Sequence, residues 1–130
     1  MSRDLKDLTP ELREIAIEWQ GECMRQAAIG DKYIFVCTYR SDADQQAAYN
    51  AGLSNAKPGQ SKHNAVNIMK RPAARAFDFG VIRFGKYIPD GKDPAYTLGG
   101  AIAESFGLEW AGRWMGKIRE TAHCQMKDKL

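Results

Sequence analysis

The chain has 130 residues, a length typical of one domain with a real hydrophobic core. Hydrophobic residues make up 44% and charged residues 27%, which is ordinary for a soluble globular protein. The net charge of +3 is too small, and the basic residues too scattered, to indicate nucleic-acid binding, although a mildly basic protein suits a polyanionic surface such as a bacterial wall.

No segment has the charged, apolar and small-residue order of a signal peptide, and no apolar run approaches a membrane span. We therefore expect a protein that is made and folded in a cytoplasm, without membrane insertion. The three cysteines, Cys23, Cys37 and Cys124, lack CxxC spacing and lie among apolar neighbours. A reducing cytosol favours free thiols, so we predict three buried thiols and no disulfide framework.

The first third of the chain predicts a helix, a strand and a second helix. Thr9-Pro10-Glu11 is typical of a helix start, and helical spacing of apolar residues, with Trp19 as a core anchor, continues to about Ala28. Residues 33–39 are rich in β-branched and aromatic side chains and predict a buried strand, followed by a short helix over 43–50.

Arg40 follows the predicted strand directly. Loops at strand ends carry functional side chains on a rigid scaffold, so Arg40 is well placed to contact a substrate or a transition-state oxyanion. Pairing with the nearby Asp42 or Asp44 on the surface is the alternative, and position alone leaves both open.

The middle of the chain leads through a loop over 53–60 to Ser61-Lys62-His63. Residues 65–74 mix apolar and basic side chains around Pro72, which predicts a surface excursion with a short helical turn, suited to a flap beside a cleft. Residues 76–84 predict a strand, and Asp78 within it would be costly to bury unless it is paired or metal-bound.

The last third predicts a hairpin or lid over 85–92 and a helix over 97–106 that ends at Gly107. An aromatic segment over 108–114 could line a cleft, and residues 118–126 predict a strand. Glu120 and His123 on that strand are three residues apart, so a turn or bulge must intervene if both side chains are to face one site.

Two histidines, an aspartate and a glutamate are what a mononuclear zinc hydrolase needs: three ligands, an open position for water, and a base. His63, Asp78, His123 and Glu120 supply these groups. Histidines at strand ends are also common as ordinary hydrogen-bonded residues, and the HExxH zinc-protease pattern is absent, so spacing alone leaves both interpretations open.

Five segments in a fixed order strengthen the zinc hypothesis. They are Thr38–Tyr49, Gly59–Asn64, Ala76–Phe79, Gly107–Trp114 and Glu120–Gln125. Together they resemble the family of zinc peptidases that contains D-alanyl-D-alanine carboxypeptidases and L-alanyl-D-glutamate endopeptidases, and especially its small single-domain bacteriophage endolysins. The similarity covers about residues 9–126. Three features depart from the family pattern: the fifteen-position separation of His63 and Asp78, Ala111 in the usual Gly-Gly-x-Trp, and Ala122 in place of proline.

The resemblance implies a role for each matched side chain. The zinc ligands would be His63, Asp78 and His123, the general acid/base Glu120, the oxyanion or carboxylate contact Arg40, and the substrate-binding residues Ser61, Gln45 and Trp114. The implied fold is α+β, with a small antiparallel sheet that carries the zinc site and helices that flank it. Residues 1–130 would form one catalytic domain without a separate wall-binding domain.

The resemblance also implies a function. We expect a zinc-dependent peptidoglycan peptidase that cuts the L-alanyl-D-glutamate bond of the stem peptide and acts as a monomer. As a phage lysis enzyme it would accumulate in the host cytoplasm and reach the wall through a holin. A D-alanyl-D-alanine carboxypeptidase or cross-bridge peptidase is the nearest alternative. A non-catalytic zinc-containing wall-binding module is another, against which Glu120 and Arg40 argue because a binder needs neither.

Overall fold

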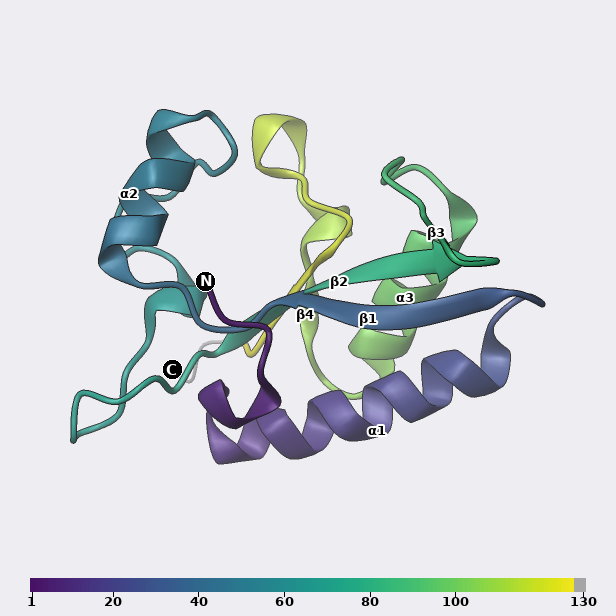
Figure 1. Ribbon diagram of the computed structural model, residues 1–130, viewed down its shortest axis with the longest axis horizontal. Helices are drawn as coiled ribbons and strands as arrows, with labels where there is room; N and C mark the ends of the chain where they lie inside the picture. The colour runs from purple at the N-terminus through teal and green to yellow at the C-terminus, as the bar shows by residue number, and fades with distance from the viewer. Residues whose placement is uncertain (128–130) are drawn as a thin grey trace.

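A small antiparallel sheet organises the molecule in the computed structural model, which describes residues 1–127 (Figure 1). The strands follow the order β1-β2-β5-β4, and β3 pairs with β2 as a short hairpin. Their bounds are β1 Asp31–Cys37, β2 Ala76–Arg83, β3 Lys86–Tyr87, β4 Glu109–Trp110 and β5 His123–Gln125.

Three helices accompany the sheet: α1 Pro10–Gln26, α2 Asp42–Asn50 and α3 Pro94–Ser105. Helices α1 and α3 contact each other and the strands, whereas α2 lies apart from them, beyond the end of β1 (Figure 1). Short 3-10 turns occupy Leu5–Asp7, Lys62–Asn64, Ala111–Arg113 and Gly116–Ile118. The predicted α+β class, with a small antiparallel sheet flanked by helices, is confirmed.

The hydrophobic core lies between the sheet and the pair α1 and α3. Trp19 is fully buried at its centre, with ring centroids 4.9 Å from Phe77 and 5.1 Å from Phe79. Its indole Nε1 donates to the carbonyl of Gly99 on α3 at 2.9 Å, so its polar edge is also satisfied. The prediction of Trp19 as a core anchor is confirmed.

Strand alternation sends Asp78 to the other face of the sheet, because Phe77 and Phe79 beside it face the core. Asp78 pairs with Cys37 on β1 and with His123 on β5. Residues directly opposite each other in an antiparallel sheet share a face. A register shift between Phe35 and Cys37 is what aligns Cys37 with Asp78. Three neighbouring strands therefore present these side chains together.

Most predicted elements are present, with altered ends. Helix α1 starts at Pro10 as predicted, although the Thr9 side chain makes no capping hydrogen bond. Helix α3 starts earlier than predicted, because Asp93 caps it and Pro94 occupies its first turn. The predicted last strand is reduced to β5, and the residues before it form turns.

The excursion at residues 65–74 is a hairpin, not the predicted helical turn. Val66 pairs with Pro72, and the Asn67 side chain accepts hydrogen bonds from the backbone N–H groups of Met69 and Arg71. No residue of this hairpin lines the cavities described below. The prediction of a flap beside the cleft is therefore wrong.

The cysteines and the helices agree with the sequence expectations. Cys23, Cys37 and Cys124 are all buried free thiols, as predicted. Within residues 1–127, every helix is too short or too polar to cross a bilayer.

Asp93 offers a test of electrostatic stabilisation far from the sheet face that carries Asp78. Two hydrogen bonds of 2.9 Å from Arg83 lower the pKa of Asp93 to about 2. A depressed carboxyl pKa stabilises the fold above the ordinary value of 3.8, and this stabilisation is lost as the pH falls toward 2. We expect Asp93→Asn, which keeps a capping oxygen, to unfold at lower urea concentration than wild type at pH 7, and by a smaller margin at pH 2. An equal deficit at both pH values would contradict this.

Candidate active site

His63 is held by a capped 3-10 turn at the edge of the sheet. The Ser61 hydroxyl accepts from the His63 backbone N–H at 3.2 Å, and the Asn64 side chain completes a capping box. The backbone N–H of Arg40 donates to the His63 carbonyl at 2.9 Å. These bonds fix the turn beside the end of β1 and leave the His63 side chain buried.

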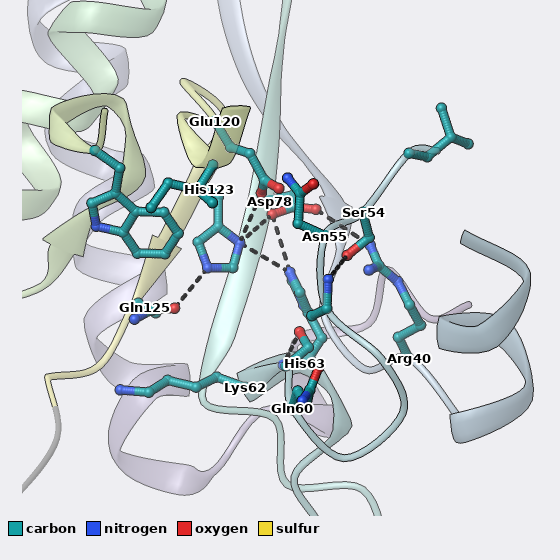
Figure 2. A pocket seen from close by; sticks show the side chains of 15 residues that line it. Arg40, Ser54, Asn55, Gln60, Lys62, His63, Asp78, Glu120, His123 and Gln125 are labelled. Carbon is teal, nitrogen blue, oxygen red and sulfur yellow. Dashed lines mark hydrogen bonds and ion pairs between the residues drawn. The ribbon is translucent and has the colours of Figure 1, made fainter. Parts of the chain in front are cut away.

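The three predicted zinc ligands meet at one point (Figure 2). His63 Nε2 lies 3.1 Å from Asp78 Oδ1, and His123 Nδ1 lies 2.9 Å from the same oxygen. The two ring nitrogens are 3.3 Å apart. Residues separated by up to sixty positions in the sequence thus place three donor atoms within reach of one ion.

Hydrogen bonds on the outer side of each ring determine which nitrogen carries the proton. His63 Nδ1 lies 2.7 Å from the carbonyl of Thr38, which can only accept. His123 Nε2 lies 2.9 Å from Gln125 Oε1, and the amide of Gln125 is oriented by donating from Nε2 to Glu109. When both rings are neutral, the two inward nitrogens therefore present lone pairs, and with Asp78 three acceptors converge.

A proton or a metal ion must lie between such acceptors, and the spacing is compatible with Zn²⁺. Tetrahedral zinc with bonds of about 2.0–2.1 Å to nitrogen and oxygen separates its ligand atoms by about 3.3 Å. The three separations here, 2.9, 3.1 and 3.3 Å, are close to that value. Three protein ligands would leave one tetrahedral position for water or substrate.

The electrostatics of the site also favour positive charge. Burial opposes a charged His63 ring, but the nearby Asp78 carboxylate outweighs burial and raises the pKa of His63 to about 10. Burial likewise opposes ionisation of Asp78, but the charge of a protonated His63 and the close contacts with both rings hold the pKa of Asp78 well below its usual range. Asp78 is thus an ionised carboxylate in a buried setting.

Cys37 belongs to a second group that could hold a metal ion. Ligand atoms of Cys37, His63 and Asp78 lie within 4.8 Å of one another. The thiol, however, contacts Nδ1 of His63 at 3.7 Å, the nitrogen that already faces Thr38. One imidazole cannot offer both nitrogens to a single ion, so His123 completes the set better than Cys37 does.

Glu120 faces the same site as His123, because a turn lies between them as their three-residue spacing required. A turn places Glu120 Oε2 3.8 Å from His123 Nδ1, and the His123 N–H donates to the Glu120 carbonyl at 3.2 Å. Ala122, which replaces the proline of the family pattern, is held by its carbonyl accepting from Phe79 at 2.9 Å. Burial raises the pKa of the half-buried Glu120 carboxyl, which makes it a stronger base.

Arg40 lies against the site and not on the free surface. Its Nη2 is 3.7 Å from Asp78 Oδ2, and its Nη1 donates to Gln45 at 3.0 Å. Neither Asp42 nor Asp44 forms an ion pair with the Arg40 side chain within residues 1–127. The structure therefore favours the first of the two interpretations that the sequence left open for Arg40.

A cavity of about 470 Å³ opens on this site (Figure 2). The 53–60 loop forms a rim of this cavity. Most of the predicted site residues also line it: Arg40, Ser61, His63, Asp78, Trp114, Glu120 and His123. A smaller cavity of about 260 Å³ shares Asp78, Glu120 and His123 and continues past Tyr87 and Tyr96. A substrate in the larger cavity would thus reach the three ligands, and its other end could extend into the smaller one.

Gln45 is the predicted site residue that the structure sets apart. It is fully buried and does not line either cavity. Sequence reasoning also missed partners that orient the ligands. Gln125 could have been found, because it lies two positions after His123 and so shares its face of the strand. The backbone carbonyl of Thr38 carries no sequence signal.

Comparison with known proteins relates the chain to others by fold. No protein-family model matches it, and no curated protein matches it. Among solved structures, it is similar to the crystal structure of the Serratia marcescens L-Ala D-Glu endopeptidase ChiX, with a TM-score of 0.66 and 19% sequence identity. The match covers 95% of this chain and 83% of that chain. The relationship to such endopeptidases is thereby confirmed at the level of the fold.

Proposed function

We propose that this protein is a zinc-dependent peptidoglycan peptidase. The observation that carries the proposal is the convergence of three hydrogen-bond acceptors, His63 Nε2, Asp78 Oδ1 and His123 Nδ1, within 3.3 Å of one another. The fold shared with ChiX, an L-Ala D-Glu endopeptidase, supports the substrate class.

The residues around the ligands have complementary roles in the proposed hydrolysis. When bound, zinc would act as a Lewis acid toward water and the scissile carbonyl. Glu120 accepts the proton of the water molecule as its oxygen attacks the carbonyl carbon, and then gives it to the leaving amine as the C–N bond breaks. Arg40 donates hydrogen bonds to the oxyanion of the tetrahedral intermediate. Trp114 bounds the cavity beside His123, with ring centroids 5.8 Å apart.

We assign the L-alanyl-D-glutamate bond of the stem peptide as the substrate bond, and phage-directed host lysis as the biological setting. The ordered motifs from Thr38 to Gln125 support both assignments through their resemblance to single-domain endolysins. In this setting the enzyme gathers in the host cytoplasm as a monomer and reaches the wall after a holin opens the membrane.

Mass spectrometry of fragments released from purified peptidoglycan tests this proposal. We expect new amino termini at D-glutamate, and L-alanine that stays attached to the glycan strand and carries a new carboxyl terminus. Loss of a terminal D-alanine alone would instead identify a D-alanyl-D-alanine carboxypeptidase. Absence of any released fragment from zinc-loaded protein would overturn the peptidase proposal.

A further inference from the structure

Gln45 is a buried amide whose hydrogen-bonding groups are all used. Its Oε1 accepts from Arg40 Nη1 at 3.0 Å and from Asn64 Nδ2 at 3.4 Å. Its Nε2 donates to Ser54 Oγ at 2.9 Å and to the carbonyl of Ala56 at 2.6 Å. One side chain on α2 therefore joins Arg40, the turn that carries His63, and the loop at the rim of the larger cavity.

Arg40 depends on this amide for its orientation. Within residues 1–127, the polar contacts of its Nη2 are long, 3.8 Å to Cys37 Sγ and 3.7 Å to Asp78 Oδ2. Its Nε is buried and has no hydrogen-bond partner among the residues that the structure describes. A buried N–H without a partner costs free energy, so the guanidinium would gain hydration by turning away. The bond to Gln45 is the shortest that the Arg40 guanidinium makes in residues 1–127, and it opposes that movement.

The other half of the amide fixes the rim. Ser54 and Ala56 both line the larger cavity, and Gln45 is hydrogen-bonded to each. Ser54 Oγ also accepts from the Ala56 backbone N–H at 3.2 Å, which closes a small network. Gln45 thus holds the rim and Arg40 at a fixed separation without touching the cavity itself.

We propose that Gln45 is a positioning residue that aims Arg40 at the reacting carbonyl and sets the rim of the cavity. The catalytic part of this inference rests on the proposed function, because it takes Arg40 as the oxyanion contact. It replaces the direct substrate contact that the sequence resemblance implied for Gln45. The structural part is that Gln45 holds Arg40 and the rim in one conformation, and it does not depend on any activity.

Kinetics of Gln45→Met, which keeps the side-chain size and removes the amide, test the catalytic part. We expect kcat to fall roughly 10- to 100-fold, as for a catalytic group displaced by about 1 Å, with zinc content unchanged. In an Arg40→Ala background the same substitution should change kcat less than about twofold, because the guanidinium that Gln45 orients is already absent. Gln46→Met, at an exposed position of α2, is the matched control and should match wild type. An equal loss from Gln45→Met in both backgrounds would overturn the inference.

Hydrogen exchange followed by NMR tests the structural part without activity. The buried Nε–H of Arg40 should exchange slowly in wild type and at least tenfold faster in Gln45→Met. Gln45→Glu keeps the acceptor for Arg40 but places a carboxylate against the Ala56 carbonyl. It should therefore preserve the slow exchange of the Arg40 Nε–H while exchange at residues 54–60 accelerates. Gln45→Glu also provides the test if Gln45→Met does not fold. Unchanged Arg40 exchange in Gln45→Met would overturn the inference. If wild type proves inactive, the proposed function fails, and these exchange rates still decide the structural part.

Discussion

Glu120→Gln should bind zinc and fold like the wild type yet lose peptidoglycan hydrolysis. The substitution keeps the size of the side chain but removes the carboxylate that accepts the proton of the attacking water. General acid–base groups contribute about 10²- to 10⁴-fold, which corresponds to about 3–5 kcal/mol of transition-state free energy. We expect a loss of kcat in that range, measured as the rate of peptide-fragment release, with KM nearly unchanged.

The position of Glu120 makes this expectation specific. Its carboxylate lines both cavities and lies 3.8 Å from His123 Nδ1 without forming part of the three-ligand cluster. Glu18→Gln, at an exposed position of α1, is the matched control and should leave the rate unchanged. Wild-type clearance by Glu120→Gln would show that another group is the base.

His63→Ala should abolish zinc binding and activity together. Wild-type protein should carry about one zinc per chain, and a chelator should inactivate it until zinc is restored. Loss of a residue that only hydrogen-bonds to a metal ligand lowers metal affinity roughly 10- to 100-fold, so removal of the ligand itself should lower zinc affinity more. Metal content by elemental analysis and hydrolysis of peptidoglycan are the two measurements.

Two companion variants separate the possible ligand sets. His123→Ala should lose zinc as His63→Ala does, because its Nδ1 belongs to the convergent cluster. Cys37→Ala should keep zinc, because the thiol faces the outer nitrogen of His63. Zinc retained in His123→Ala and lost in Cys37→Ala would assign the metal to the cysteine group. A metal-free wild type with full lytic activity would contradict the zinc mechanism itself.

Local sequence patterns were sufficient to predict the helices and strands whose hydrophobic residues repeat with a regular spacing or form a continuous buried run. Helical spacing identified α1 and its core residue Trp19, and β-branched and aromatic runs identified most of β1 and the whole of β2. Residues 65–74 were misjudged because their conformation depends on a bridge between Val66 and Pro72 and on the Asn67 side chain. Neither contact has a periodic signal.

Residue chemistry in the sequence was enough to nominate His63, Asp78, His123 and Glu120, since few side chains can bind zinc or move a proton near neutral pH. Only the tertiary structure decided how they meet. The pairing of Asp78 with His123 brings one histidine to the carboxylate, and the capped turn at Ser61 brings the other.

The tertiary structure also decided the surroundings of two side chains. Arg40 turned out to lie beside Asp78, and Gln45 to be buried behind it with four hydrogen bonds. The physical reason is that the surroundings of a side chain depend on strand register, burial and hydrogen-bond partners from distant segments. A sequence states which chemical groups are available, and packing determines which of them share a site.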